Sequence, residues 1–268
     1  MMKKYALVTN HEKDTDLRAT SDAAALLLEC GAEPIRLAAG DEIPGDVEAV
    51  ITFGGDGTLL HAAWQTSLLG KPILGVNVGT LGFLTELEAG ELPLLKKLVS
   101  GEYHTEKRMM LSIDVFRNGD RVFHEDALND AVISHGEIMR VIPLSLCCDG
   151  TEVKSFRGDG IIASSPTGST AYSLSAGGPV VDPMADSILI TPLSAHALYA
   201  KSFVFSPERK IEIRIGDLEG RSAFVAGDGR DVFSLSSGDT VAIARSSLTT
   251  ELIRIKDKDF YRILYQKL

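Results

Sequence analysis

The hydrophobic positions of the first hundred residues alternate between short apolar runs and helical periods. Short apolar runs, which are typical of buried strands, occupy residues 4–10, 34–38, 48–53 and 71–79. Helical spacing of apolar residues covers 15–32, 58–70 and 91–101, and each of these segments has a glycine at its C-terminal end. Strands that alternate with helices indicate βαβ units and a parallel sheet.

The period of the pattern changes near residue 103. Apolar and polar residues alternate from 111 to 115 and again from 211 to 215, which predicts strands with one buried face. The dipeptides Asn118-Gly119 and Asp149-Gly150 are favourable for hairpin turns. This half of the chain is therefore predicted to be mostly antiparallel β, arranged as a sandwich.

The change of period predicts two domains, an α/β domain over residues 1–102 and a β-rich domain over residues 103–249. No Pro/Ser-rich linker separates the two patterns, so the boundary is expected to be tight. The last stretch, DKDFYRILYQKL, has a helical pattern. We expect the C-terminal segment, about 250–268, to pack back on the first domain.

Composition narrows the classes of protein that fit this pattern. Of the 268 residues, 44% are apolar and 24% are charged, which is ordinary for a globular protein with a sizeable core. The net charge of −10 argues against a general nucleic-acid binder, because phosphate-backbone affinity comes from clustered Lys and Arg. No apolar run reaches membrane-span length, and the N-terminus lacks a signal-peptide core. Three cysteines, of which two are adjacent, suggest reduced thiols in a cytoplasmic protein.

One tripeptide, Gly-Asp-Gly, occurs three times, at residues 55–57, 158–160 and 227–229. The third copy is explained at least equally well as a simple turn. The second copy precedes an apolar run, which puts its aspartate at the start of a strand. The first copy is the most specific, because a predicted strand precedes it and an amphipathic helix follows it.

The first copy raises a question of charge. Glycine turns before helices commonly bind phosphate through backbone N–H groups, and the carboxylate of Asp56 would repel that phosphate. The chain contains neither the Walker string with its lysine nor G-x-G-x-x-G after the first strand. Any nucleotide would therefore bind by a scheme other than these two.

Two further segments carry polar groups suited to a ligand. Residues 159–181 are dense in Ser, Thr and Gly, which fits either a strand-to-helix cap or a surface that approaches a polar ligand closely. Asn129-Asp130 follows a predicted strand. An amide beside a carboxylate can hold two vicinal ribose hydroxyls, because the amide donates and the carboxylate accepts.

Four segments together resemble the NAD kinase family, and the likeness runs over nearly the whole chain in the right order. They are Gly54-Gly55-Asp56-Gly57-Thr58, GVNVGTLGFL, Asn129-Asp130 and SSPTGSTAYSLSAGGP. The GGDGT string alone is shared with diacylglycerol and sphingosine kinases and, more loosely, with phosphofructokinases. The combination with GTLGF and PTGSTAYS narrows the resemblance to NAD kinases.

This resemblance implies an enzyme that transfers the γ-phosphoryl of ATP, or of polyphosphate, to the 2′-hydroxyl of the adenosine ribose of NAD. It implies a Rossmann-like α/β domain, a β-sandwich-like domain, and an active site in the cleft between them. Mg²⁺ or another divalent cation is the implied cofactor, and a homodimer or homotetramer the implied assembly, with no residue assigned here as a metal ligand. Asp56 is the implied acceptor of the hydroxyl proton or, alternatively, the residue that mainly organises Mg²⁺. The implied binding residues are Gly54, Gly55, Gly57, His61, Phe83, Asn129, Asp130, Arg157, Asp159, Thr167, Thr170, Ala171, Tyr172, Ser175 and Arg230.

Three of these assignments carry an alternative or a condition. His61 is equally well explained as an exposed helix histidine. Arg157 and Asp159 match family residues that reach the ligand in the assembled oligomer, including from a neighbouring subunit. Arg230 stands where many members have glutamine, and a guanidinium there would pair with a phosphate if it faced the ligand.

Two other functions fit part of the pattern. A lipid kinase of the diacylglycerol or sphingosine type shares the GGDGT loop, but TGSTAYS is unexpected there and no basic amphipathic stretch for membranes is visible. A non-catalytic dinucleotide-binding module would keep Asn129-Asp130 but would have no use for Asp56.

Overall fold

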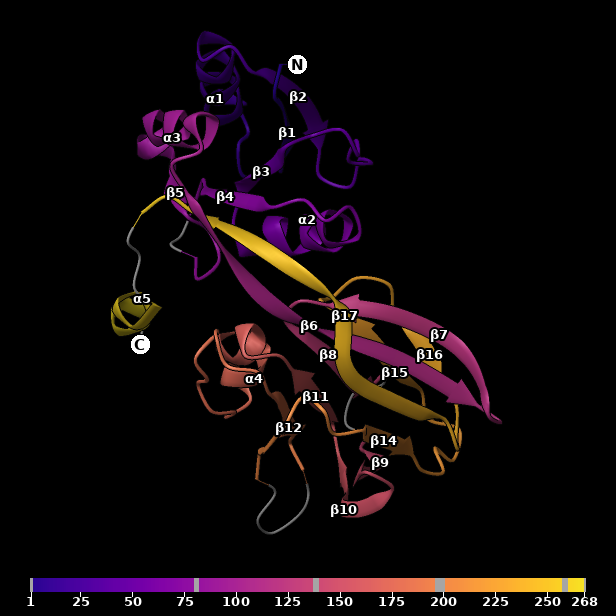
Figure 1. Ribbon diagram of the computed structural model, residues 1–268. Coiled ribbons are helices and arrows are strands. Elements are labelled where there is room, and N and C mark those ends of the chain that lie inside the picture. The colour runs from indigo at the N-terminus through magenta and orange to yellow at the C-terminus, as the bar shows by residue number, and fades with distance from the viewer. Residues whose placement is uncertain (1, 80–81, 137–139, 196–200, 257–259, 268) are drawn as a thin grey trace. The chain divides into compact units, whose positions relative to one another are not determined.

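The computed structural model describes residues 2–79, 82–136, 140–195, 201–256 and 260–267. The chain divides into two compact units, one of Met1–Arg108 with Thr249–Leu268 and one of Met109–Leu248. It passes from the first unit to the second within β6 (His104–Arg117) and returns within β17 (Thr240–Arg254) (Figure 1). Each unit is described by itself below.

The first unit is a parallel α/β layer structure. Its strands pair in the order β2-β1-β3-β4, and all of these neighbours are parallel. The strands are β1 (Lys4–Thr9), β2 (Glu33–Ala38), β3 (Ala49–Gly54), β4 (Ile73–Asn77) and β5 (Leu87–Glu88). The helices are α1 (Arg18–Glu29), α2 (Asp56–Leu68), η1 (Ala89–Leu94), α3 (Leu95–Ser100) and α5 (Phe260–Lys267).

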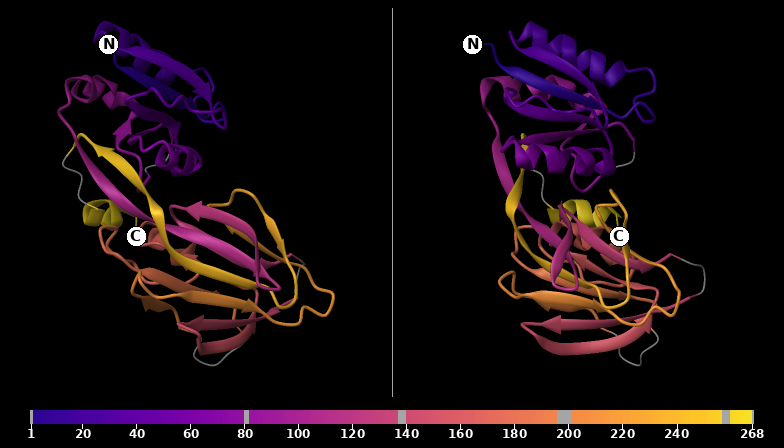
Figure 2. Two further views of the ribbon diagram at one scale, coloured as in Figure 1. Left: turned by 45° about the vertical axis from the view of Figure 1, so that its right-hand side comes forward. Right: turned by 90° about the vertical axis from the view of Figure 1, so that its right-hand side faces the viewer.

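Burial explains why these strands form the centre of the unit. Every residue of β3 and β4 is buried, as expected for parallel strands covered on both faces. Apolar residues of α1, η1 and α3 share one core with the sheet, whereas α2 lies on the opposite face (Figure 2). Because the strands are parallel, their carboxyl ends share one edge of the sheet. The turn from β3 to α2 lies at this edge.

The helix predicted over 91–101 is divided in the structure. It begins earlier, as the 3-10 helix η1, and becomes α-helical only at α3. Pro93 lies inside η1, and its missing N–H group disfavours a regular α-helical turn there. The side chains of Glu88 and Glu91 form a capping box that satisfies the first backbone donors.

The second unit contains two β-sheets. A six-stranded antiparallel sheet has the order β13-β12-β11-β8-β15-β16, and β10, β9, β14, β17, β6 and β7 belong to the other. The strands are β7 (Asp120–Ala127), β8 (Asp130–His135), β9 (Ile142–Cys148), β10 (Thr151–Gly158), β11 (Gly160–Ser164), β12 (Ile188–Leu193), β13 (Phe203–Phe205), β14 (Ile211–Ile215), β15 (Ala223–Gly227) and β16 (Phe233–Leu235). Two short helices, η2 (Thr167–Thr170) and α4 (Tyr172–Ser175), follow β11.

One hydrophobic core lies between these two sheets. Leu111, Ile113 and Val115 of β6 are fully buried in it, together with alternate residues of strands from both sheets. Both predicted hairpin turns join neighbouring strands, and all four of their central residues have positive φ, from +49° to +93°. The prediction of an α/β part followed by a β-sandwich-like part is confirmed.

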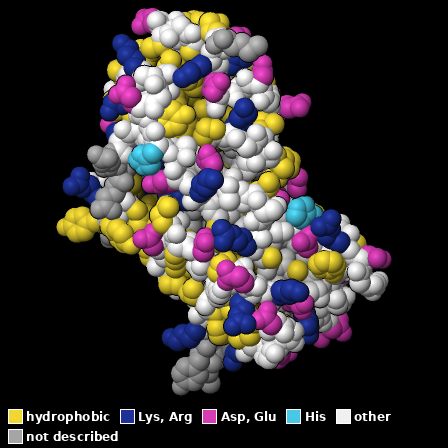
Figure 3. Space-filling view, viewed as in Figure 1, with side chains coloured by type: hydrophobic (Ala, Val, Ile, Leu, Met, Phe, Trp, Pro, Cys, Tyr) yellow, Lys and Arg dark blue, Asp and Glu magenta, His cyan; other side chains and the backbone are white. Residues whose placement is uncertain are grey.

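The surface carries charges of both signs. On the face shown in Figure 3, Lys and Arg side chains are scattered among Asp and Glu side chains. Among the described helices, none has the length and apolar character needed to span a bilayer.

Candidate functional site

The first Gly-Asp-Gly turn joins β3 to α2. At Gly54 a Cβ atom would lie 2.1 Å from Oγ1 of Thr58, so a side chain would collide with the helix that follows. Gly55 caps α2 in an extended conformation, and Asp56 is the first helical residue. A carboxylate in the first turn is stabilised by the positive end of the helix dipole. The turn therefore keeps Asp56 at a position where its negative charge is favourable.

Asp56 also holds a second loop of the same unit. Its Oδ2 accepts a hydrogen bond from the backbone N–H of Phe83 at 2.8 Å. Its Oδ1 accepts from the N–H groups of Leu84 at 3.0 Å and Thr85 at 3.3 Å. At Gly82, a Cβ atom would lie 2.1 Å from Oδ1 of Asp56, so this approach requires glycine. Backbone donors thus surround the carboxylate that the sequence left unexplained.

The side chains of two other predicted residues of the first unit, His61 and Phe83, have different surroundings from the Asp56 carboxylate. His61 is exposed, and five residues along a helix turn it by about 140° from Asp56, onto another face of α2. Phe83 is half-buried; its ring lies 6.2 Å from that of Phe260, and Nζ of Lys267 lies 4.4 Å from its centroid. The backbone of Phe83, and not its ring, is what contacts Asp56.

In the second unit, the third Gly-Asp-Gly turn holds the backbone of Asn129 and Asp130. The Asp228 carboxylate accepts hydrogen bonds from the N–H groups of Leu128 at 2.7 Å, Asn129 at 2.8 Å and Asp130 at 3.1 Å. In return the N–H of Asp228 donates to the carbonyl of Asp130 at 2.9 Å. Asp228 and Gly229 have φ of +49° and +68°, in the left-handed region that Asp and Gly tolerate best. This turn therefore determines how the Asn-Asp pair begins β8.

The proximity of two buried carboxylates changes their proton affinity. Burial and, to a smaller extent, the negative charge of Asp228 together raise the pKa of Asp130 to about 7. Burial also raises the pKa of Asp228, whereas three backbone N–H groups and Arg230 oppose that rise. Asp130 is 6% exposed, so its carboxyl group exchanges a proton near neutral pH in a largely dry position.

Asn129 presents an acceptor that nothing in the described part of the chain satisfies. Its Oδ1 is buried and has no hydrogen-bond partner among the described residues. Its backbone is held in place, because its carbonyl accepts from the N–H of Ser165 at 2.8 Å. At Gly168 a Cβ atom would lie 2.1 Å from the same carbonyl oxygen, so the two segments pack backbone to backbone. A ligand hydroxyl would supply the missing donor.

The TGSTAYS segment follows directly, as η2 and α4. Thr167 is 5% exposed, and its carbonyl accepts a hydrogen bond from Oγ1 of Thr170 at 3.3 Å. Tyr172 is 49% exposed, Ser175 is exposed and Ala171 is half-buried. Because Gly168 packs against Asn129, this polar segment lies beside the Asn-Asp pair.

The Arg230 side chain is directed to an acidic neighbour. Its Nη2 lies 3.0 Å from Oε1 of Glu125 and donates to the carbonyl of Asp126. Glu125 also accepts from the N–H of Gly227 at 2.8 Å. Burial raises the pKa of Glu125, and Arg230 counteracts this rise. A direct phosphate contact by Arg230 would require this ion pair to open.

Asp159 directly precedes β11, and Arg157 lies two residues earlier, in β10 of the other sheet. Strand β11 pairs with β8 so that Ser164 lies opposite Asp130, whereas Gly160 lies opposite the other end of β8. Four residues of strand span about 13 Å. Within one chain, therefore, the structure does not bring Arg157 and Asp159 together with the Asn-Asp pair.

Sequence reasoning missed the residues that position this site. Of the three Gly-Asp-Gly aspartates, only Asp228 is absent from the predicted site residues, although the repetition of the tripeptide was a visible signal. Gly82, Glu125 and Ser165 gave no such signal, because each acts through a contact with a residue distant in sequence. Thr80 and Leu81 of the GTLGF string lie outside the described residues.

Comparison with known proteins identifies the family. The profile of the ATP-NAD kinase N-terminal domain matches residues 3–103, and that of the ATP-NAD kinase C-terminal domain matches residues 128–255. The chain belongs to the NAD kinase family. As a member of this family it is an enzyme, a kinase whose phosphoryl acceptor is NAD. The resemblance to NAD kinases is confirmed, and the lipid-kinase and non-catalytic alternatives are set aside.

Individual NAD kinase relatives match over the full length. The NAD kinase of Caldanaerobacter subterraneus subsp. tengcongensis is 40% identical over 281 aligned positions, covering 100% of this chain and 99% of the relative. That of Symbiobacterium thermophilum is 41% identical with the same coverage. An NAD kinase from Archaeoglobus fulgidus, solved in complex with ATP, superposes with a TM-score of 0.82 at 27% identity, covering 98% of both chains. Yeast NADH kinase complexed with NADH has a TM-score of 0.87 at 21% identity, covering 99% of this chain and 87% of that one, and shows the shared fold.

Proposed function

We propose that the chain transfers the γ-phosphoryl group of ATP to the 2′-hydroxyl of the adenosine ribose of NAD, which yields NADP. The observation that carries this proposal is the buried Oδ1 of Asn129, which has no partner among the described residues and lies beside the buried Asp130. A buried acceptor without a donor costs about 1–3 kcal/mol. A pair of vicinal ribose hydroxyls removes that cost, because one donates to Asn129 and the other donates to ionised Asp130.

Asp56 is the proposed acceptor of the proton from the 2′-hydroxyl. A ribose hydroxyl is a poor nucleophile until a base takes its proton, and such assistance contributes about 10²–10⁴ in rate. Among the described residues, Oδ2 of Asp56 accepts one hydrogen bond and Oδ1 accepts two. Oδ2 therefore keeps a lone pair for the substrate, while the loop donors keep the carboxylate in position.

The residues fit a divalent cation that arrives with ATP. No group of three His, Cys, Asp or Glu side chains suited to a metal occurs in the described ranges. Mg²⁺ in phosphoryl-transfer sites is commonly bound by one or two carboxylates together with substrate phosphates. Asp56 would hold such a cation, which neutralises phosphate charge when bound. The remaining catalytic requirement on this chain is to orient the two substrates.

The other proposed contacts are those implied by the family resemblance. Gly57 is exposed at the start of α2, where the backbone can approach a phosphate closely. Tyr172 offers an exposed ring against which an adenine can stack. Arg157 and Asp159 are proposed to act on the ligand of a neighbouring subunit, which agrees with their distance from Asp130 in one chain. A homodimer or homotetramer is therefore the expected assembly.

A cytoplasmic location is the expectation for this enzyme. All three cysteines, Cys30, Cys147 and Cys148, carry free thiols. Unpaired cysteines are ordinary in a reducing compartment.

An acceptor assay tests the proposal. The purified chain is incubated with ATP, Mg²⁺ and NAD, and NADP is measured with an NADP-dependent dehydrogenase. In parallel, NAD whose adenosine ribose lacks the 2′-hydroxyl is offered at the same concentration, and phosphorylated product is sought by mass spectrometry. NADP from NAD and no product from the deoxy form is the expected result. Phosphorylation of the deoxy form would overturn the acceptor assignment.

A further inference from the structure

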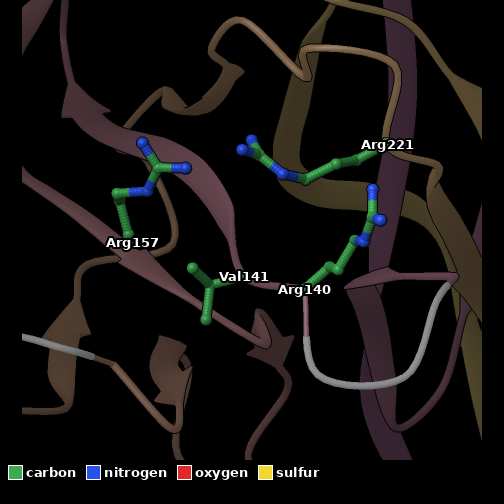
Figure 4. A pocket seen from close by; sticks show the side chains of 4 residues that line it. All are labelled: Arg140, Val141, Arg157 and Arg221. Atoms are coloured by element: carbon green, nitrogen blue, oxygen red, sulfur yellow. The ribbon is translucent and has the colours of Figure 1, made fainter.

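Arginine side chains have two kinds of surroundings in this chain. In the second unit, Arg140, Arg157 and Arg221 line a cavity of about 280 Å³ together with Val141 (Figure 4). In the first unit, Arg254 is 7% exposed and is enclosed by protein groups at the end of β17. A buried guanidinium is costly unless protein acceptors satisfy it, so the partners of Arg254 show what it holds in place.

Among the described residues, three acceptors contact the Arg254 guanidinium. Its Nη1 lies 3.3 Å from Oε2 of the fully buried Glu86, and its Nε donates to Oε2 of Glu106 at 3.0 Å. Nη1 also donates to the carbonyl of Leu84 at 3.2 Å. Burial acts to raise the pKa of Glu106, but Arg254 and Arg108 outweigh it and hold that pKa below its usual range. Glu106 therefore stays ionised near neutral pH and, with Glu86, fixes the orientation of the guanidinium.

The carbonyl of Leu84 shares one peptide group with the N–H of Thr85. In a planar trans peptide, the C=O and the N–H point in opposite directions. Arg254 donates to the carbonyl end of this group at 3.2 Å, and Oδ1 of Asp56 accepts from its N–H end at 3.3 Å. A positive charge at the carbonyl polarises the peptide and strengthens the hydrogen bond at the other end. The guanidinium therefore determines both the orientation and the donor strength of a group that holds Asp56.

Backbone contacts hold the same loop between β4 and the end of β17. The N–H of Glu86 donates to the carbonyl of Gly75 in β4 at 2.8 Å. At Gly75 a Cβ atom would lie 2.9 Å from Cα of Thr85, so the loop packs directly on the strand. Oε1 of Glu86 in turn accepts from the N–H groups of Ile255 at 3.0 Å and Lys256 at 2.7 Å. The segment that follows Arg254 is thus fixed to the loop that contacts Asp56.

We propose that Arg254 is a positioning residue for phosphoryl transfer, which holds the Leu84–Thr85 peptide so that the Asp56 carboxylate keeps its orientation toward the substrate. This inference rests on the proposed role of Asp56. The guanidinium is engaged with protein groups, so it acts through Asp56 and not on a substrate. Without it, the peptide loses the contact that fixes its plane, and Asp56 loses an aligned donor. Misplacement of a reacting group by 1 Å lowers the rate by about 10²-fold.

Steady-state kinetics of Arg254→Gln in the full chain test the inference. We expect kcat to fall about 10- to 100-fold. The KM for NAD should stay close to that of the unaltered chain, because the residues proposed to bind the ribose lie in the other unit. Arg254→Gln leaves Glu86 buried without its cation, so Glu86→Gln/Arg254→Gln is measured beside it and should show the same fall in kcat with less loss of stability.

The matched control is Arg117→Gln. Arg117 likewise joins a buried carboxylate, that of Asp239, to a backbone carbonyl, that of Ser234, but it lies in the second unit. The control variant should lower the free energy of unfolding and leave kcat unchanged.

Combination with Asp56→Asn shows whether Arg254 acts through Asp56. In the Asp56→Asn background, Arg254→Gln should lower kcat by about twofold at most, because the carboxylate that it positions is already absent. A merely structural role would lower kcat by the same factor in both backgrounds.

The outcomes separate this inference from the proposed role of Asp56. Unchanged kcat in both Arg254 variants, an equal loss in Arg117→Gln, or equal factors in the two backgrounds would overturn the positioning role. A large loss in Asp56→Asn beside unchanged kcat in Arg254→Gln would overturn that role alone. Near-normal turnover in Asp56→Asn would overturn the proposed base and the positioning role together.

Discussion

Asp56 and Asp228 are the central residues of two copies of the same tripeptide, and each accepts hydrogen bonds from three successive backbone N–H groups. Asp56 holds residues 83–85 in the first unit, and Asp228 holds residues 128–130 in the second. Their surroundings differ. Asp56 begins helix α2, whereas Asp228 lies in a left-handed turn beside the buried Asp130.

This difference separates two uses of one local sequence. The helix dipole and the loop donors stabilise the charge of Asp56, so it remains available for chemistry at the positive end of α2. Asp228 instead holds the backbone that presents Asn129 and Asp130 to a ligand. The copy at residues 158–160 does neither in the described part of the chain: the N–H of Asp159 donates to the carbonyl of Leu193, and its carboxylate lies 3.5 Å from Nε2 of His135.

The largest expected effect is on the turnover number, kcat, which should depend on Asp56 far more than on Asp228. Asp56→Asn should lower kcat by about 10²–10⁴, because the amide cannot take the hydroxyl proton. NAD affinity, measured by calorimetry, should stay roughly intact, because Asn129 and Asp130 lie in the other unit. Asp46→Asn, which alters an exposed aspartate of the same unit, serves as the control. Near-normal turnover in Asp56→Asn would remove the assignment of Asp56 as the base.

Asp228→Asn should show the opposite pattern of kinetics. The amide nitrogen of the asparagine is a donor and cannot accept from the backbone N–H groups of residues 128–130. The loop would therefore lose hydrogen bonds to a charged group, each of which contributes about 1.5–3 kcal/mol. We expect the KM for NAD to rise about tenfold or more while kcat falls far less, and the free energy of unfolding to fall by about 2–3 kcal/mol.

The matched control for this variant is Asp186→Asn, since Asp186 is an exposed aspartate of the same unit whose carboxylate pairs with Arg245. A fall in kcat as large as that of Asp56→Asn, with KM unchanged, would contradict the positioning role of Asp228.

The pH dependence of NAD binding sharpens the comparison at Asp130. Its pKa is raised from 3.8 to about 7, so below that pH the folded protein carries a protonated carboxyl. Because ionised Asp130 accepts from the ribose, affinity should weaken about tenfold per pH unit below the pKa, as measured by calorimetry between pH 6 and 8. An affinity that is flat over this range would exclude Asp130 as the titrating group.

The same pKa shift makes a prediction for folding. Between about pH 4 and 7 the folded state binds the Asp130 proton more tightly than the unfolded chain, so the free energy of unfolding should fall as pH rises. Asp130→Asn should remove that part of the slope in denaturant titrations. A slope that survives the substitution would assign the effect to another carboxyl group.

Arg230→Gln should change activity least. The substitution leaves Glu125 buried without its cation, which should raise the Glu125 pKa further and lower the free energy of unfolding by about 3 kcal/mol. The KM values for ATP and NAD should stay close to those of the unaltered chain, because the guanidinium is engaged with Glu125. A selective rise in the KM for ATP would instead support a phosphate contact by Arg230.

The periodicity of apolar residues predicted the fold well, because the burial of one or both faces of a strand directly determines that periodicity. The fully buried strands β3 and β4 have continuous apolar runs, and β6 alternates in step with its burial. The Asn118-Gly119 turn could be predicted because its backbone requires positive φ at both residues. The divided helix near Pro93 was not predicted, since apolar spacing does not distinguish a 3-10 from an α-helical turn.

By itself, the sequence determined the fold class, the turn from β3 to α2, and which segments carry ligand chemistry. These features depend on neighbours within a few residues or on side-chain burial, which leave a period or a motif in the chain. Only the tertiary structure decided that Asp56 and Asp228 both hold three N–H groups, that Arg230 pairs with Glu125, and that three arginines share a cavity. Each of these joins residues far apart in sequence, where hydrogen-bond geometry and charge, rather than spacing, determine the partner.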